Sequence, residues 1–270
     1  MEPFSKFHAL GNDFVVVDRR QSGVDFDAAA TRALCDRHRG IGADGVLAIL
    51  PATGALGRMV VHNADGSVAE MCGNGIRCVA RFLAEKEAAR PASIAIDTGA
   101  GVKQCALEWQ GAQVARVTVE MGRAGYVAAH LPAGGGFVER ALAGHVGTAV
   151  SMGNPHFVLF QTPATEAAKV GPLLERDAAF PQRTNVEFAS KREAGGLSVT
   201  VWERGVGLTQ ACGTGACAAV AVGAKLGRVP YDAWVPVELP GGLLEVQVTK
   251  DTQAVSMRGP ATFVFDGVLP

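Results

Sequence analysis

The sequence predicts two pseudo-symmetric α+β domains, each a curved, mostly antiparallel sheet wrapped around a central helix. Three observations support this fold class. A cysteine motif at residues 71–78 (MCGNGIRC) recurs in similar form at residues 211–217 (ACGTGAC). Strand-like and helix-like segments follow one another in the same order in both halves of the chain. Glycine is frequent, at 34 of 270 residues, which is typical of a sheet protein with many turns.

The duplication extends beyond the cysteines. Cys212 follows Cys72 by 140 residues, and a Gly-Asn turn at residues 11–12 recurs 142 residues later at residues 153–154. Repetition at matched spacing and in the same order indicates two copies of one structural unit. The predicted domains are residues 1–120 together with the last strand at residues 261–270, and residues 121–260.

Apolar alternation and β-branched residues predict the strands, and a period of 3.6 residues predicts the helices. A helix is expected over residues 25–39, with Asp27 as its N-cap and basic residues in its last turn. Each cysteine motif leads into a further helix, over residues 76–87 and residues 216–226. The first half has predicted strands at residues 4–9, 14–18, 46–50, 58–62, 94–97, 102–109 and 114–121. The second half has a predicted helix at residues 164–176 and strands at residues 148–151, 156–160, 185–189, 197–202, 235–239, 243–248, 254–258 and 262–265.

Each motif places a cysteine directly before a Gly-x-Gly turn and a helix. The N-terminus of a helix has unpaired N–H groups and the positive end of the helix dipole, which stabilise a thiolate or hold a carboxylate. The glycines let the backbone approach a ligand closely. A free thiol has a pKa of about 8.5, and this setting is expected to lower it towards neutral pH. We therefore predict that Cys72 and Cys212 give or take a proton.

A polar residue ends an apolar strand nine residues before each cysteine. This residue is Asn63 in the first half and Glu203 in the second. Each half thus combines a Gly-Asn turn, a polar residue at a strand end and a cysteine. The arrangement predicts two half-sites that face one ligand, with the active site in a cleft between the domains.

Charge and composition exclude several classes of function. The formal net charge of −1 gives no electrostatic basis for binding nucleic acid or a membrane surface. The N-terminus has no apolar signal-peptide core, and no stretch approaches 18 uninterrupted apolar residues. A cytoplasmic protein is therefore expected, and its six cysteines are expected to be reduced.

Seven short motifs carry a resemblance to a known family. They are residues 8–14 (HALGNDF), 63–67 (NADGS), 70–78 (EMCGNGIRC), 153–156 (GNPH), 184–188 (TNVEF), 203–205 (ERG) and 211–217 (ACGTGAC). In this order they resemble the diaminopimelate epimerases, cofactor-independent amino-acid epimerases that use two cysteines. The resemblance covers essentially the whole chain. Asn74 separates the sequence from the related proline racemases, which carry histidine at that place.

The resemblance implies interconversion of LL- and meso-2,6-diaminopimelate in lysine biosynthesis. Inverting a stereocentre at Cα needs a base on one face and an acid on the other. Cys72 and Cys212 supply both groups, so neither pyridoxal phosphate nor any other cofactor nor a metal is required. The amides that follow each cysteine are expected to bind the α-carboxylate, where negative charge grows as the proton leaves. These amides belong to Gly73 and Asn74, and to Gly213 and Thr214.

The resemblance also implies the residues that bind the two amino-acid ends of the substrate. They are Asn12, Asn63, Asn154, Asn185, Glu203 and Arg204. Arg204 suits the distal carboxylate because a guanidinium binds a carboxylate through two hydrogen bonds. His156 and Glu203 are expected to bias which thiol is ionised. The family further implies a homodimer.

Two positions depart from a pattern found in many members of the family. Some members have Gln where this chain has Gly45, and many have Glu where this chain has Leu208. Neither position belongs to a cysteine motif. We therefore expect the substrate contacts, and not the proton transfer, to differ from those members.

Other interpretations of the same residues stay open. The spacing within each cysteine motif is close to that of zinc ligands, although the second cysteine falls inside a helix. Residues 40–45 (GIGADG) match the dinucleotide fingerprint but precede a strand, not a helix. The remaining cysteines are expected to be inert core residues, namely Cys35, Cys78, Cys105 and Cys217.

Three alternative functions also stay open. The first is a racemase of another amino acid on the same scaffold. The second is a catalytically silent protein that binds an amino acid without exchange of its Cα proton. The third is a redox-switched protein in which Cys72 and Cys212 form a disulfide when oxidised.

Overall fold

The computed structural model describes residues 2–133 and 135–269. The chain divides into two compact units. The first unit holds the described residues up to Val119 together with those from Arg258 onward, and the second holds residues 120–257. The chain crosses from one unit to the other within two strands, β8 (Gln113–Arg123) and β17 (Ala254–Gly259).

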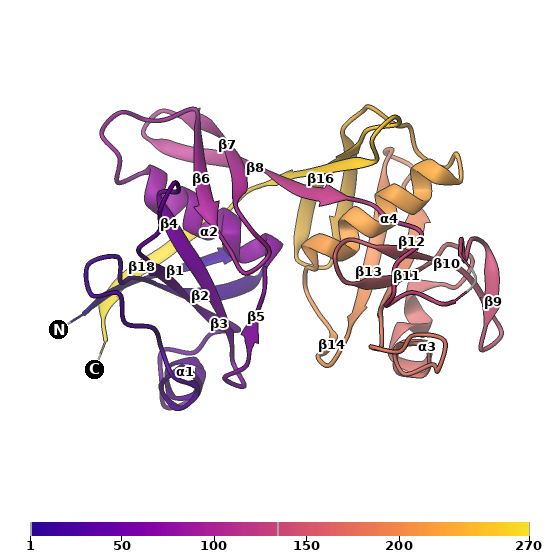
Figure 1. Cartoon of the computed structure of the whole chain (residues 1–270), viewed down its shortest axis with the longest axis horizontal. Helices are drawn as coiled ribbons and strands as arrows, with labels where there is room; N and C mark the ends of the chain where they lie inside the picture. The colour runs from indigo at the N-terminus through magenta and orange to yellow at the C-terminus, as the bar shows by residue number, and fades with distance from the viewer. Residues whose placement is uncertain (1, 134, 270) are drawn as a thin grey trace. The chain divides into compact units, whose positions relative to one another are not determined.

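The first unit is built on a sheet whose strands pair mostly antiparallel (Figure 1). Besides β8, its strands are β1 (Pro3–Ala9), β2 (Asn12–Asp18), β3 (Gly45–Leu50), β4 (Gly57–Asn63), β5 (Val68–Ala69), β6 (Ser93–Asp97), β7 (Lys103–Gln110) and β18 (Thr262–Val268). β1 pairs antiparallel with both β2 and β18, β3 with β4, β4 with β5, β6 with β7, and β7 with β8. The β2–β3 and β4–β6 pairs are parallel.

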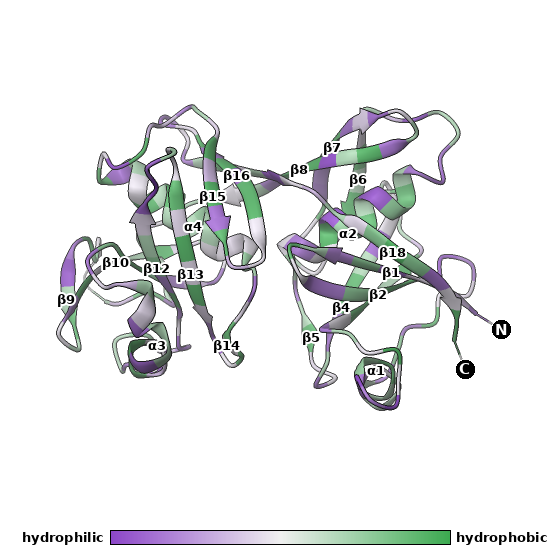
Figure 2. Cartoon of the chain, turned by 180° about the vertical axis from the view of Figure 1, so that it is seen from behind, coloured by the Kyte–Doolittle hydropathy of each residue, from purple (hydrophilic) through white to green (hydrophobic). Residues whose placement is uncertain are grey.

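The second unit repeats this pairing in the same order. Its strands are β9 (Arg140–Leu142), β10 (His145–Ser151), β11 (Pro155–Leu159), β12 (Asn185–Lys191), β13 (Leu197–Glu203), β14 (Gly207–Leu208), β15 (Val235–Leu239) and β16 (Gly242–Val248). The strands β10 to β16 correspond in order to β1 to β7. Each pair among them has the same direction, parallel or antiparallel, as the corresponding pair of the first unit. Figure 2 shows hydrophobic and polar stretches alternating along strands such as β13, one face of which is buried. The duplication predicted from the motifs is therefore present in the strand order.

One long helix lies among the strands of each unit (Figure 1). In the first unit α2 (Gly73–Ala84) contacts β1, β2, β3, β4, β6 and β7, and in the second α4 (Gly213–Lys225) contacts the corresponding β10, β11, β12, β13, β15 and β16. In α2 all residues except Arg81 are buried, and in α4 all except Thr214 and Lys225. The predicted α+β class, with a sheet wrapped around a central helix, is confirmed in each unit.

The helices differ from their predicted ranges in ways that hydrogen bonding explains. Both cysteine helices begin three residues earlier than predicted, because the Gly-x-Gly segment forms the first helical turn. Glycine is tolerated there, since the first N–H groups of a helix need no partner within it. The predicted helix at residues 25–39 is only α1 (Ala28–Cys35), with Asp27 as its N-cap as expected. Asp36 Oδ1 accepts from the backbone N–H groups of His38 and Arg39, and this local turn replaces the helix.

The helix of the second unit that corresponds to α1 is also shorter than predicted. A 3₁₀ turn (Ala164–Glu166) leads into α3 (Ala167–Glu175). The strands β5, β9 and β14 were not predicted, because two or three residues are too few to show a period. Within the described part of the chain, every helix is too short or too polar to cross a membrane.

Arg77 is a fully buried charge in the middle of α2. Its guanidinium donates to Gly73 O at 3.0 Å, to Asn74 Oδ1 at 3.0 Å and to Pro260 O at 3.2 Å. These bonds tie the first turn of the helix to the segment before β18. A buried charge is tolerated only when hydrogen bonds replace its lost hydration.

We predict that Arg77→Ala lowers the free energy of unfolding by about 3 kcal/mol, because it leaves several buried acceptors without a donor. Urea denaturation monitored by circular dichroism measures this change. Arg58→Ala is the matched control, since the Arg58 side chain is 53% exposed and its loss is expected to change stability little. Equal effects of the two substitutions would contradict the prediction.

Candidate functional site

Cys72 and Cys212 are the N-cap residues of the two buried helices. Both have extended backbone angles, and each sulfur accepts a hydrogen bond from the helix that it begins. Cys72 Sγ lies 3.3 Å from Gly75 N, and Cys212 Sγ lies 3.4 Å from Gly215 N. The prediction that each leading cysteine stands at a helix N-terminus is confirmed.

Gly215 explains why the motif needs glycine after the cysteine. A Cβ at this position would lie 3.0 Å from Val201 Cγ2, 3.1 Å from Glu187 Oε1 and 3.3 Å from Cys212 Sγ. In the first unit, a Cβ at Gly75 would lie 2.9 Å from Leu47 Cδ2. The missing side chains therefore let the helix start approach the sheet and the sulfur closely.

Cys212 is buried, with 7% of its surface exposed, and Cys72 is half-buried. Burial raises the pKa of Cys212 well above the ordinary thiol value, and the nearby carboxylates of Glu203 and Glu187 raise this pKa further. Hydrogen bonds from the Thr214 hydroxyl and the Gly215 N–H oppose the increase but do not cancel it. The expected lowering of the pKa by the helix terminus is thus wrong for Cys212, because desolvation outweighs the two donors. The raised pKa favours the thiol form of Cys212 over the thiolate.

The other cysteines are buried as predicted. Cys78 and Cys217 lie inside the two helices, at positions with no exposed surface. Burial raises the pKa of Cys35 to about 11 and the pKa of Cys78 to about 12. These two thiols are therefore poor nucleophiles and poor bases at neutral pH.

Two of the predicted polar residues of the first unit, Asn12 and Asn74, belong to one connected network, and Asn74 lies two residues after Cys72. Asn74 Nδ2 donates to Asn12 Oδ1 at 3.2 Å, and Asn12 Nδ2 donates to Asp44 Oδ2 at 2.9 Å. Arg77 holds the Asn74 carbonyl oxygen from the other side. Asn12 and Asn74 are thereby fixed in orientation.

A cluster of charges lies next to this network. Arg37 donates to Asp13 and to Asp44, and Lys6 donates to Asp13 as well. Burial alone would raise the pKa of Asp13, but hydrogen bonds from Arg37 and Lys6 outweigh it and lower the pKa to about 2. Asp13 and Asp44 lie in the motifs at residues 8–14 and 40–45, but the cluster was not predicted, because its carboxylates and cations come from separate segments.

Asn63 ends β4, as predicted, and belongs to the tight turn that follows. Its Nδ2 donates to Ser67 Oγ at 2.9 Å, and its backbone N–H donates to Ser67 O at 2.8 Å. The matched residue of the second unit, Glu203, ends β13. Glu203 Oε1 accepts a hydrogen bond from Thr209 Oγ1 at 2.6 Å.

His156 connects two predicted positions of the second unit. It is completely buried, with Nε2 2.9 Å from Asn154 Oδ1 and Nδ1 2.7 Å from Glu187 Oε1. Asn154 is thus held by the same ring that contacts Glu187. Glu187 was quoted only as part of a motif, and its role was missed. The available signal was a charged residue between two apolar ones in a strand, Val186 and Phe188.

The Asn185 side chain is hydrogen-bonded to the backbone of Arg204. Asn185 Nδ2 donates to Pro155 O at 3.0 Å, and Asn185 Oδ1 accepts from Arg204 N at 3.0 Å. The exposed Arg204 guanidinium donates to Gln182 O at 3.0 Å through Nη1. Because a guanidinium has five N–H donors, this contact leaves it able to bind a carboxylate.

The two departures from the family pattern have different surroundings. A Cβ at Gly45 would lie 2.5 Å from His62 O, so this backbone admits no side chain there. Leu208 is 51% exposed in the short strand β14.

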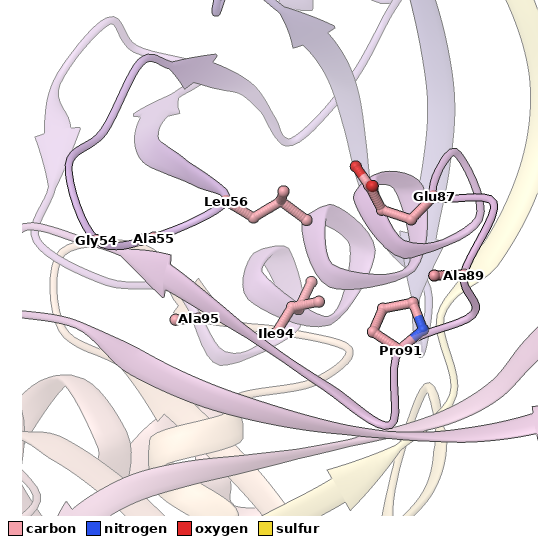
Figure 3. A pocket seen from close by; sticks show the side chains of 8 residues that line it. All are labelled: Gly54, Ala55, Leu56, Glu87, Ala89, Pro91, Ile94 and Ala95. Atoms are coloured by element: carbon pink, nitrogen blue, oxygen red, sulfur yellow. The ribbon is translucent and has the colours of Figure 1, made fainter.

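A surface pocket of about 450 Å³ lies elsewhere on the first unit (Figure 3). Its lining is mainly apolar, with Leu56, Pro91 and Ile94 on its walls and the carboxylate of Glu87 at one side. None of the residues that line it belongs to a cysteine motif. The apolar lining lacks the cations and paired amides that an amino-acid substrate needs.

Solved structures share this fold. A hydroxyproline epimerase from Agrobacterium vitis matches with a TM-score of 0.73 and 16% identity, covering 98% of this chain and 90% of the other. A PhzF-family phenazine biosynthesis protein from Bacillus anthracis matches with a TM-score of 0.75 and 14% identity, covering 98% of each chain. The protein thus has the fold class of these structures, a duplicated α+β unit, and in this chain a cysteine stands at the head of each central helix.

Sequence comparison defines the family within this class. The family model for diaminopimelate epimerase matches residues 4–127 and 148–264. The chain is 44% identical to the diaminopimelate epimerase of Desulforudis audaxviator over 98% of both chains. It is also 44% identical to that of Synechocystis sp., over 98% of this chain and 97% of the other. The chain belongs to the diaminopimelate epimerase family.

We predict that Gly215→Ala changes the reactivity of Cys212 towards iodoacetamide by at least about tenfold, because the new methyl group displaces the sulfur or the Glu187 carboxylate. Gly223→Ala in the same helix is the matched control. Its Cβ would lie at a similar 3.1 Å from Val229 Cγ2, but away from the cysteine. Both changes are expected to lower stability by about 1–3 kcal/mol. Unchanged Cys212 alkylation in a folded Gly215→Ala protein would refute the prediction.

Proposed function

We infer that this chain is a diaminopimelate epimerase, an isomerase that interconverts LL- and meso-2,6-diaminopimelate in lysine biosynthesis. The observation that carries the inference is a pair of cysteines that cap the two central helices, in a chain 44% identical to diaminopimelate epimerases over nearly its full length. Inverting one stereocentre needs an acid and a base. The two capping thiols are suited to both roles.

We propose that Cys72 and Cys212 act on one Cα. In one direction the Cys72 thiolate takes the Cα proton, and the electron pair of the broken C–H bond moves towards the α-carboxylate. The Cys212 thiol then gives its proton to the opposite face of the same carbon, and becomes a thiolate. The reverse reaction exchanges the roles. The raised pKa of Cys212 supports its entry into the cycle as the acid.

The helix starts supply the electrostatic part of the proposed mechanism. The N–H groups of Gly73 and Asn74, and of Gly213 and Thr214, belong to first helical turns. Such groups stabilise the charge that grows on the α-carboxylate as the proton leaves. This contribution costs no rearrangement during the reaction, because the helices are already buried and fixed.

The asparagine side chains and Arg204 are proposed to hold the two ends of the substrate. Asn12 and Asn74 in the first unit, and Asn154 and Asn185 in the second, are oriented by the hydrogen bonds described above. Asn63 and Glu203 are proposed to bind the substrate as well, because they stand at matched positions at the ends of β4 and β13. Amides and carboxylates of this kind recognise ammonium and carboxylate groups together. We further propose that each unit is one epimerase half and that the protein forms a homodimer.

The decisive experiment is proton NMR of LL-diaminopimelate in D₂O with reduced, pyridoxal-free protein. Deuterium is expected to enter Cα together with formation of the meso product. Cys72→Ala and Cys212→Ala are each expected to lose turnover by at least about 1000-fold, since each removes one of two obligatory proton carriers. Binding without exchange would instead indicate a silent amino-acid-binding protein. If diaminopimelate is neither bound nor exchanged, a panel of other amino acids tests the alternative of a racemase with another substrate.

Arg204→Lys tests whether the Arg204 guanidinium binds the distal carboxylate of the substrate. Lysine keeps the charge but loses the planar pair of donors, so KM is expected to rise about tenfold with little change in kcat. Steady-state kinetics measures both constants. Arg183→Lys is the control, because Arg183 is 58% exposed and contacts Glu175 instead. A fall in kcat with unchanged KM would contradict the assigned role.

A further inference from the structure

Glu187 is a buried charged residue that the proposed proton transfer does not yet use. It lies in β12 between Val186 and Phe188, and its exposed surface is 0%. β12 runs parallel to β11, which brings His156 beside Asn185 in register. The parallel pairing therefore places the His156 ring against the Glu187 carboxylate.

His156 holds Glu187 through one carboxyl oxygen. Its Nδ1 faces Glu187 Oε1 at 2.7 Å, and its Nε2 faces Asn154 Oδ1 at 2.9 Å. Burial raises the pKa of Glu187, and the Glu203 carboxylate adds to this increase, while the charge and hydrogen bond of His156 oppose the increase without cancelling it. Contact with His156 therefore favours the ionised form of Glu187.

The second oxygen of Glu187 has a different environment. Within residues 2–133 and 135–269, Oε2 is buried without a hydrogen-bond partner. A buried carboxylate oxygen without a donor is costly, and native structures retain such groups mainly where they act in function. No hydrogen-bond donor among the described residues screens this oxygen, so negative charge on it acts on the neighbouring groups.

Cys212 is the neighbour on which this charge acts. Glu187 Oε1 lies 3.1 Å, and Cys212 Sγ 3.3 Å, from the position that a Cβ at Gly215 would occupy. The carboxylate and the sulfur therefore flank one backbone position without any side chain between them. In this low-dielectric setting a thiolate next to a carboxylate is disfavoured by charge repulsion.

The other charged groups around α4 divide into two sets. Glu203 at the end of β13 also acts on Cys212, and His156 on β11 acts through Glu187. The remaining groups face elsewhere. His145 on β10 contacts Thr162, Glu238 on β15 pairs with Arg192, and Glu245 on β16 alternates with the buried Leu244 and Val246.

We propose that Glu187 is a positioning residue for the proton of Cys212: its buried carboxylate, anchored by His156, keeps this thiol protonated until the substrate carbanion takes the proton. The role of Glu187 in the reaction rests on the proposed function, whereas its effect on the protonation of the Cys212 thiol does not. The hydrogen bond between His156 and Glu187 Oε1 fixes the orientation of the carboxyl group. Glu203 provides a second carboxylate at the strand end that matches Asn63.

The test is the pH dependence of Cys212 alkylation by iodoacetamide, measured on the Cys212 peptide by mass spectrometry. In the unmodified protein the midpoint is expected above the ordinary thiol value of about 8.5. Glu187→Gln keeps the size of the side chain but removes its charge. It is expected to lower the midpoint by roughly one pH unit and to leave that of Cys72 unchanged.

Three further variants separate charge from packing. Glu187→Asp keeps the charge and is expected to retain most of the high midpoint, whereas a packing role predicts greater damage from Asp than from Gln. His156→Gln removes the group that lowers the pKa of Glu187, so the negative charge on Glu187 is expected to decrease and the Cys212 midpoint to fall by a second route. Glu175→Gln is the control, since Glu175 is also a buried glutamate of the same unit but contacts Trp202 and Gly205. Its Cys212 midpoint is expected to equal that of the unmodified protein.

Two results would overturn the proposal. One is a Cys212 midpoint at or below about 8.5 in the unmodified protein. The other is an unchanged midpoint in either folded variant, Glu187→Gln or His156→Gln. Alkylation needs no substrate, so these results are independent of diaminopimelate turnover. A shifted midpoint without Cα exchange in the unmodified protein would keep the role of Glu187 and reject the proposed function.

Discussion

The hydrogen bond from a first-turn N–H to a cysteine sulfur is the contact on which the rest of the site depends. It occurs in both units, from Gly75 to Cys72 and from Gly215 to Cys212. The helix that donates it is buried along nearly its whole length, so the sulfur is held by the core of its unit. A sheet wrapped around a helix therefore supplies a fixed thiol, and duplication supplies two.

The two units use one scaffold for different electrostatics. The start of α2 is surrounded by amides and a buried guanidinium, as Asn74, Asn12 and Arg77 show. The start of α4 is surrounded by carboxylates, since Glu203 and Glu187 both act on Cys212. Equal backbone positions thus have unequal surroundings, polar and cationic at Cys72 and acidic at Cys212.

Much of the fold was predictable from the chain alone. Strand alternation and the repeated order of elements gave most strands to within a few residues, because a half-buried strand shows its period directly. Helix ends were less predictable: the glycines that read as a turn form the first turn of α2 and α4, and Asp36 ends α1 through its side chain. The positions of both capping cysteines followed from the motif. Glu187 did not stand out, since its partner His156 is 31 residues away in sequence.

The sequence by itself determined that the cysteine motif comes in two copies and that each copy leads into a helix. Helix capping and glycine turns depend on residues close together in the chain, so a short motif is enough to predict them. Only the tertiary structure decided the ionisation of Cys212. Its pKa depends on how far packing removes water and on which carboxylates the parallel pairing of β11 with β12, and the end of β13, bring to the helix start. Desolvation and charge act through space, so no pattern along the chain reports them.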